Sequence, residues 1–217
     1  MVIPSIAHAA ACRLTLAQLL APSPDVQPPY TRASLGSRTW DILVRDGDVI
    51  ELWDGHGLPA GMAPSPELRA LSLADHVPRA VVVGRRTAAW VHTGSPRPVR
   101  LCVLYAARGY RPRNTAGLDV SQAAVRPWET SALGGLRITD PTRTALDVAT
   151  WLPDDEVRSV LLPLLHDGVD VDACLLRLDR VASWRGAARA REMLLDAERA
   201  YQDVIRTGSG SPPSSSR

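Results

Sequence analysis

Lysine and phenylalanine do not occur anywhere in the 217 residues, so every cationic side chain other than histidine is an arginine. This bias is typical of a GC-rich genome, and a high arginine content is therefore not by itself evidence of function. The lack of lysine does argue against one class of enzyme. A restriction-type nuclease places a lysine beside its metal-binding carboxylates, and this chain has none to place there.

Cysteine is scarce, and its spacing argues against two common scaffolds. The three cysteines, Cys12, Cys102 and Cys174, lie far apart and form no C-x-x-C pair, which disfavours both a disulfide framework and a zinc site. The five histidines show no H-x-x-x-H or H-E-x-x-H spacing, and the chain has neither a G-x-S-x-G elbow nor a G-x-x-x-x-G-K-[ST] loop. We expect no cofactor, no bound metal and no enzymatic activity.

Long apolar runs are also missing. No run approaches the roughly 18 residues that a membrane-spanning helix needs, so we expect no membrane association. The N-terminus lacks a basic residue before its Ala-His-Ala, and Arg13 interrupts the apolar run, which argues against a signal peptide. We expect a cytoplasmic protein of one large or two small domains, and we favour two.

Acidic residues are absent from one long stretch, His76 to Leu118, which covers 43 positions. Eight arginines lie there, so this fifth of the chain carries a charge of +8 although the whole chain carries only +2. They are Arg79, Arg85, Arg86, Arg97, Arg100, Arg108, Arg111 and Arg113. Such asymmetry is typical of a surface that meets polyanions, because each basic group near a phosphate releases a condensed counterion. The alternative is that these arginines are ordinary solvated positions on a sheet and its loops.

The segment RGYRPRN within this stretch is the best candidate for phosphate contacts. Arg108, Arg111 and Arg113 lie there among proline and glycine, in a predicted loop where all three side chains can point to solvent. Arg85 and Arg86 follow a predicted strand and are weaker candidates, because one of them could cap or pair within the fold.

The N-terminal residues 1–64 have the outline of a winged helix-turn-helix. Short helices are predicted at Ser5–Ala11 and Thr15–Leu20, followed by a proline-rich turn. A third helix is predicted between an N-cap at Ser37 and a left-handed Gly47. Strands at 48–53 and 56–60, joined by an Asp-Gly turn, would form the wing.

In such a domain the third helix enters the major groove. Trp40 lies with Leu43 and Val44 on one face of this helix, and the opposite face carries Arg38 and Arg45 together with Asp41 and Ile42. The candidate DNA contacts in this domain are Arg32, Ser37, Arg38, Thr39 and Arg45. From Thr31 to Gly61, however, three arginines face five acids. An alternative therefore stays open, in which the winged helix is structural and its acidic wing faces a basic protein partner.

Residues 65–206 have the pattern of a mixed α/β domain with a small sheet and C-terminal helices, and residues 207–217 have the composition of a disordered tail. Strands are predicted at 79–84, 99–105, 118–125 and 136–138. Helices are predicted after Ser65-Pro66, over RTAAWVHTG, after Asp140-Pro141, and at 154–166, 171–182 and 187–206. The fold class is therefore α+β.

Two segments together resemble a known family. GRRTAAWVHTG (84–94) and ITDPTRTALDVA (138–149), behind an N-terminal winged helix, are similar to the AbiEi-type antitoxins of type IV toxin-antitoxin systems, above all to the actinobacterial branch. The resemblance covers about residues 5–197. It implies a transcriptional regulator that binds double-stranded DNA at its own promoter, represses its operon and counteracts a nucleotidyltransferase-like toxin.

What the two motifs themselves imply is packing rather than catalysis. In the family pattern the TAAW element is a buried strand-to-helix junction and the TRTALD element begins a helix, and no catalytic role comes with either. The chain departs from the pattern in its proline-rich insertion at 22–30 and in its acidic wing.

Overall fold

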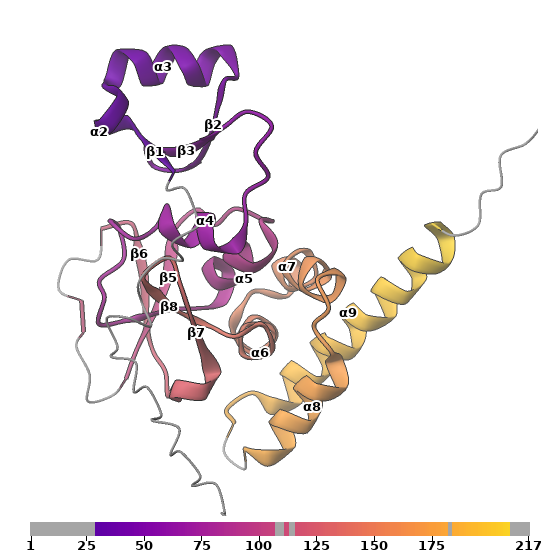
Figure 1. Ribbon diagram of the computed structural model, residues 1–217. Helices are drawn as coiled ribbons and strands as arrows, with labels where there is room; N and C mark the ends of the chain where they lie inside the picture. The colour runs from indigo at the N-terminus through magenta and orange to yellow at the C-terminus, as the bar shows by residue number, and fades with distance from the viewer. Residues whose placement is uncertain (1–28, 107–110, 113–115, 182–183, 209–217) are drawn as a thin grey trace, which may run out of the picture.

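The computed structural model describes residues 29–106, 111–112, 116–181 and 184–208 of the chain. Residues 30–59 form a small unit at one end of the molecule, with α3 on the side that faces away from the rest (Figure 1). Its three-stranded sheet has the order β1-β3-β2 and is antiparallel throughout. Its elements are β1 (Tyr30–Thr31), α2 (Arg32–Leu35), α3 (Ser37–Asp46), β2 (Val49–Trp53) and β3 (His56–Pro59).

Local sequence signals explain most of this unit. Gly47 adopts a left-handed conformation with φ of 80° and donates its N–H to the carbonyls of Leu43 and Val44, which ends α3 as predicted. The start of the helix differs from the prediction by one residue. Gly36 is the N-cap and Ser37 is already helical, so no side chain caps the first turn of α3.

The winged-helix assignment is tested only in part by this geometry. The helices predicted at Ser5–Ala11 and Thr15–Leu20 lie outside the described residues. What is described is a short helix, a longer helix and a hairpin, with a third strand, β1, added to the hairpin. The winged helix itself therefore stays a prediction.

The second sheet has five strands in the order β6-β5-β4-β8-β7. It is mixed, since β4 pairs in parallel with β8 and β5 in parallel with β6, whereas the β4–β5 and β7–β8 pairs are antiparallel. Its strands are β4 (Val82–Val83), β5 (Leu101–Tyr105), β6 (Leu118–Gln122), β7 (Thr130–Leu133) and β8 (Leu136–Thr139). The predicted strand 79–84 is thus reduced to two residues.

Strand β7 was not predicted. It forms a hairpin with β8 around Gly134 and Gly135, whose φ angles are 55° and 76°. Two glycines at positive φ are a signature of a tight hairpin turn. A Cβ at Gly134 would also lie 2.4 Å from the backbone nitrogen of Leu71, so this turn needs glycine for its close approach to α4 (Pro66–Leu71). The 3-10 helix η1 (Pro127–Glu129) precedes β7.

Helix α5 lies between the sheet and the remaining helices. Ala88, Trp90 and Val91 belong to the hydrophobic cluster of the sheet, whereas Ala89 belongs to the cluster of the C-terminal helices. The GRRTAAW segment is therefore a buried strand-to-helix junction between β4 and α5, as predicted. The helices are α5 (Arg85–Thr93), α6 (Pro141–Trp151), α7 (Asp154–His166), α8 (Val171–Arg180) and α9 (Ala187–Gly208).

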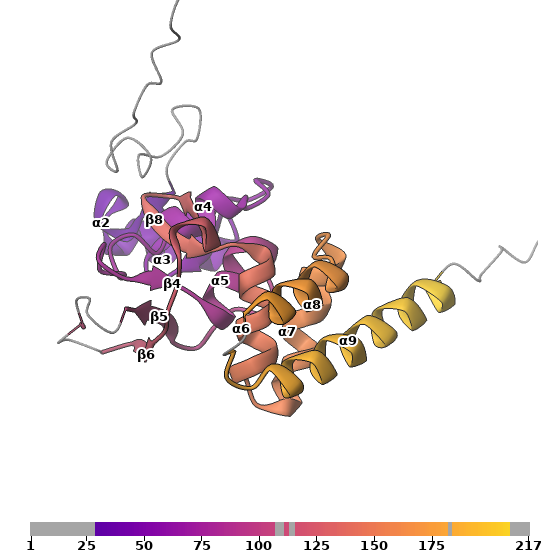
Figure 2. The same ribbon diagram turned by 90° about the horizontal axis from the view of Figure 1, so that it is seen from below.

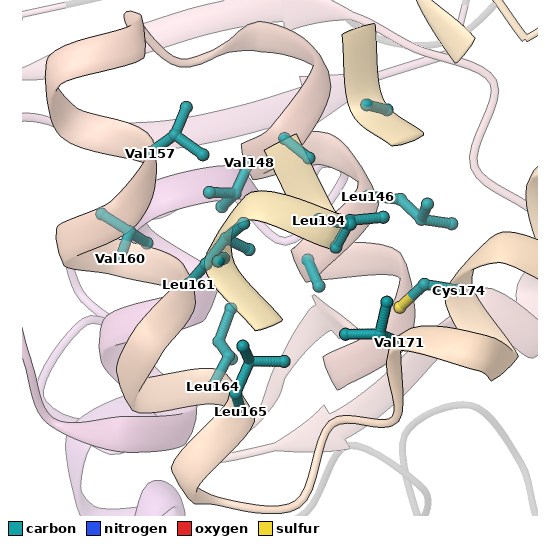
Figure 3. Close-up of a cluster of buried hydrophobic side chains, with 14 of the residues drawn as sticks. Leu146, Val148, Val157, Val160, Leu161, Leu164, Leu165, Val171, Cys174 and Leu194 are labelled. Atoms are coloured by element: carbon teal, nitrogen blue, oxygen red, sulfur yellow. The ribbon is translucent and has the colours of Figure 1, made fainter. Parts of the chain in front are cut away.

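The C-terminal helices have a hydrophobic core of their own, which Figure 3 shows in close-up. Leu146 and Val148 of α6, Leu161 of α7 and Leu194 of α9 point into it. Ala190, Leu194 and Ala197 form an apolar stripe along α9, and all three are buried in this core. Further along, Val204 is 61% exposed, because the last turns of α9 extend beyond the helices that it packs against (Figure 2).

The observed architecture is thus α+β, with small sheets and C-terminal helices, as predicted. The two parts of the molecule are in contact through the hairpin, since Leu52 and Leu58 pack on Leu68 of α4, and the rings of Trp53 and Trp90 lie 5.9 Å apart. Within the described residues, no helix is long and apolar enough to cross a membrane.

Candidate functional site

The outer face of α3 is solvent-exposed. Arg38, Asp41, Ile42 and Arg45 are exposed, whereas Trp40 is 3% exposed and packs inward. These exposures confirm the two faces that were predicted for this helix. The sequence could predict them because the 3.6-residue period assigns each residue to one face of the helix. The predicted contacts Ser37 and Thr39 are also exposed, in the first turn.

Ion pairs occupy two of the three arginines of this unit. The Nη2 atom of Arg32 lies 2.8 Å from Oδ1 of Asp41, and the Nε atom of Arg45 lies 2.8 Å from Oδ1 of Asp46. Arg38 has no carboxylate partner among the described residues. Arg38 is therefore the residue of this face whose charge is most available to an external anion.

Several arginines of the acid-free stretch, His76 to Leu118, are engaged within the fold. Arg86 forms an ion pair with Glu156 of α7, and the guanidinium of Arg85 lies 5.5 Å from the ring centre of Trp151. These two weaker candidates are half-buried and engaged in contacts within the protein.

The arginines that precede β5 are also engaged. Arg100 donates to the carbonyl of Leu118 at 2.7 Å. The guanidinium of Arg97 lies 5.1 Å from the ring centre of Trp53. Both residues are nevertheless exposed, so their charges remain at the surface.

The predicted loop contacts fall largely outside the described residues. Arg108 and Arg113 lie there, and only Arg111 is described, with an exposed side chain. The described candidate contacts are thus divided between α2 and α3 at one end of the molecule and the start of α5 (Figure 1), with Arg111 between β5 and β6.

The ITDPTRTALDVA motif builds a feature that the sequence did not predict, a buried ion-pair network. Asp140 caps α6 by accepting the N–H of Arg143 at 2.6 Å. The Nε atom of Arg143 donates to both carboxylate oxygens of Asp147 at 3.0 Å. Its Nη1 atom donates to Glu129 at 2.8 Å and to the carbonyl of Ala124 at 3.0 Å. Arg143, Asp147 and Glu129 are all 5% exposed or less.

Arg177 of α8 closes this network. Its Nη2 atom lies 3.3 Å from Glu129 and its Nη1 atom lies 3.2 Å from Asp140. Glu129 also accepts the backbone N–H of Arg126 at 2.8 Å, so both of its oxygens have partners. The network joins η1 at the edge of the sheet to α6 and α8, and so fixes the helices relative to the sheet.

The signal for this network was only partly present in the sequence. Arg143 and Asp147 have the i,i+4 spacing of a helical ion pair, but that spacing alone usually describes an exposed pair. Glu129 comes from a separate element, which only the fold brings to Arg143. The network therefore depended on tertiary structure.

Burial has a consequence for the titration of Asp147. Removal from water raises the pKa of this carboxyl to about 6, against the opposing effect of Arg143. A carboxyl whose pKa is higher in the folded than in the unfolded protein lowers stability as the pH rises from the unfolded to the folded pKa, because in this interval only the unfolded protein has released the proton. We expect this loss between about pH 4 and pH 6, with a maximum of roughly 3 kcal/mol.

The measurement is chemical unfolding at several pH values for the parent and Asp147→Asn. The asparagine variant should lack this component, so the difference in unfolding free energy between the two proteins should change across the pH 4–6 window. A difference that is constant with pH would contradict the raised pKa.

Two adjoining cavities border the network. One has a volume of about 380 Å³ and is lined by Trp151, Trp184, Arg126 and Arg185, among others. The other has a volume of about 600 Å³ and lies between η1 and α8. Both are lined by Arg126 and Glu129. Among the described residues there is no group of three or more metal-ligating side chains that could hold a metal ion.

No family model matches the chain, and no curated protein matches it. Among solved structures, it is similar to the RV2827C protein from Mycobacterium tuberculosis, with a TM-score of 0.39 and 16% sequence identity over 80% of this chain and 73% of that one. A likeness this distant carries no argument about the function of this chain.

Proposed function

We propose that this chain is a non-catalytic, DNA-binding regulator of the antitoxin type, which represses its own operon through α3 and counteracts a toxin protein. The observation that carries the proposal is the outer face of α3, where Arg38 is exposed and has no carboxylate partner among the described residues. An α-helix fits the major groove, and the N-terminal residues of a recognition helix are those that contact base edges.

The start of α3 adds support. Gly36 supplies no side chain to cap the first turn, so the N–H groups of this turn have no side-chain acceptor from the N-cap. Uncapped N–H groups at a helix N-terminus favour an anion such as a backbone phosphate. Ser37, Arg38 and Thr39 are all exposed in this turn, where such contacts and a base contact could occur together.

We expect Arg38→Ala combined with Arg45→Ala to weaken binding to the promoter duplex. An arginine that contacts guanine through two hydrogen bonds contributes about 1–3 kcal/mol, so a loss of roughly 5- to 150-fold is expected. Most of it should come from Arg38, because Arg45 is already paired with Asp46. The measurement is fluorescence anisotropy with a duplex from the upstream region, together with a footprint.

The matched control is Arg206→Ala, which removes an exposed arginine from the far end of α9. It should bind like the parent. If the α3 double variant gives the same footprint and affinity as the parent, α3 is not the recognition helix.

A second candidate function has its own supporting observation. Two of the three arginines in the N-terminal unit are already paired with acids, and Asp48 at the start of the hairpin is exposed. This acidic unit suits a basic protein partner. In this alternative the α3 unit is structural and the chain acts as a protein-binding antitoxin or scaffold.

Salt dependence distinguishes the two candidates. If Arg108, Arg111 and Arg113 bind phosphates, changing all three to alanine should weaken binding to specific and random duplexes equally. The log-log salt slope should fall by up to about 0.9 for each phosphate that is no longer neutralised. An interface with a protein, dominated by apolar anchors, responds much less to salt. Equal slopes for the triple variant and the parent would favour the protein-binding candidate.

A further inference from the structure

The groove between η1 and α8 has the size and the lining of a ligand site. Its volume of about 600 Å³ lies within the range of small-molecule pockets, roughly 300–1,000 Å³. Three arginines line it, Arg126, Arg177 and Arg180, against a single carboxylate, Glu129. Neither the acid-free stretch nor α3 contributes to this groove.

The charge of the groove is not balanced within the protein. Both oxygens of Glu129 are already bonded, to Arg143 on one side and to Arg177 on the other. Arg126 and Arg180 are exposed and have no carboxylate partner among the described residues. Two positive charges therefore face the groove without compensation, which favours an anionic ligand. Planar guanidinium groups suit phosphate because they can donate two parallel hydrogen bonds.

One wall of the groove is aromatic and exposed. Trp128 is 69% exposed, and the guanidinium of Arg126 lies 5.3 Å from its ring centre. Leu176 of α8, which is 52% exposed, also lines the groove. An exposed aromatic ring beside arginines that have no carboxylate partner suits a nucleotide, because the base can stack on the ring while the arginines bind the phosphate.

We infer that this groove binds a nucleotide, with its base stacked on Trp128 and its phosphate held by Arg126 and Arg180. The nucleotide can be free or can be a unit of a single strand, since both present the same base and phosphate. The adjoining cavity of about 380 Å³, with Trp184 and Arg185, provides room for a neighbouring unit of a strand. This inference is independent of α3 and of the binding of duplex DNA.

Calorimetric titration of the full chain tests it with four probes. These are adenosine 5′-monophosphate, a 5′-phosphorylated adenine pentanucleotide of DNA, inorganic phosphate and adenosine. We expect the nucleotide to bind more tightly than phosphate or adenosine alone, because only the nucleotide uses both the ring and the arginines. Equal binding of nucleotide and pentanucleotide indicates a free nucleotide or a strand end, and tighter binding of the pentanucleotide indicates a single strand.

Three variants separate the inferred contacts. Trp128→Ala should lower nucleotide affinity about tenfold or more, as expected when base stacking is removed. Arg126→Ala and Arg180→Ala should also lower nucleotide affinity. Arg126→Ala keeps the hydrogen bond that the backbone N–H of residue 126 donates to Glu129. Ile50→Ala, an exposed apolar residue of the hairpin, and Arg206→Ala are the matched controls and should bind like the parent.

Several results would overturn the inference. They are no binding of the nucleotide or the pentanucleotide at millimolar concentration, equal affinity for nucleotide and inorganic phosphate, and unchanged affinity in Trp128→Ala. Duplex binding measured in parallel separates this outcome from the proposal for α3. The groove variants should keep duplex affinity, and Arg38→Ala should keep nucleotide affinity.

Discussion

Arg143→Ala is expected to lower the free energy of unfolding by about 3–5 kcal/mol, because it leaves two buried carboxylates without their cation. Asp147 and Glu129 are 2% and 5% exposed, and both accept hydrogen bonds from Arg143. The carbonyl of Ala124 also loses its donor. The measurement is equilibrium unfolding in urea at neutral pH.

Two controls show that burial, rather than ion pairing in general, sets this cost. Arg158→Ala removes an exposed partner of Asp196, and exposed pairs contribute only about 0–1 kcal/mol. The triple variant Arg143→Met, Asp147→Asn, Glu129→Gln contains none of the three charges. It should therefore recover much of the stability that Arg143→Ala loses. An Arg143→Ala protein that unfolds like Arg158→Ala would show that the network does not stabilise the fold.

Trp40→Ala is expected to destabilise the N-terminal unit by roughly 3–5 kcal/mol, as for other large buried aromatic side chains. Trp40 is 3% exposed and lies over β3, where a Cβ at Gly57 would be 3.0 Å from its ring. Glycine at this position therefore makes room for the ring.

The matched control is Ile42→Ala on the opposite face of α3, where the side chain is 41% exposed. It should change stability by much less, because little apolar area is removed from the interior. Circular dichroism and intrinsic fluorescence during thermal unfolding measure both variants. Equal stability of Trp40→Ala and the parent would mean that α3 packs through its other face.

The sequence predicted helix positions well where a local signal fixed the end. Asp140-Pro141 and Ser65-Pro66 start α6 and α4 as predicted, and Gly47 and Gly94 end α3 and α5 in a left-handed conformation. Such signals act within four residues, so no distant contact can easily override them. Where the signal was weaker, the ends moved, and α8 stops at Arg180 rather than at 182.

Charge was the property that the sequence predicted least well. The stretch from His76 to Leu118 contains no acid, but Glu156, which is far away in the chain, comes to pair with Arg86. Glu129 likewise reaches Arg143 from another element. The sequence allowed a pair within the fold for one of Arg85 and Arg86, and Arg86 forms it. The sequence could not identify the partner, because a strand or helix can bring an opposite charge from any distance along the chain.

The sequence by itself determined most of the helices and strands, the two faces of α3, and the buried TAAW junction, because each depends on spacings of a few residues. It did not predict β1, α2 or β7. Only the tertiary structure decided the strand order β6-β5-β4-β8-β7, the burial of Arg143 with Asp147 and Glu129, and the groove between η1 and α8. These depend on residues far apart in the chain. Their approach follows from burying the apolar faces of the sheet and helices together, since burial of apolar area is the main favourable contribution to folding.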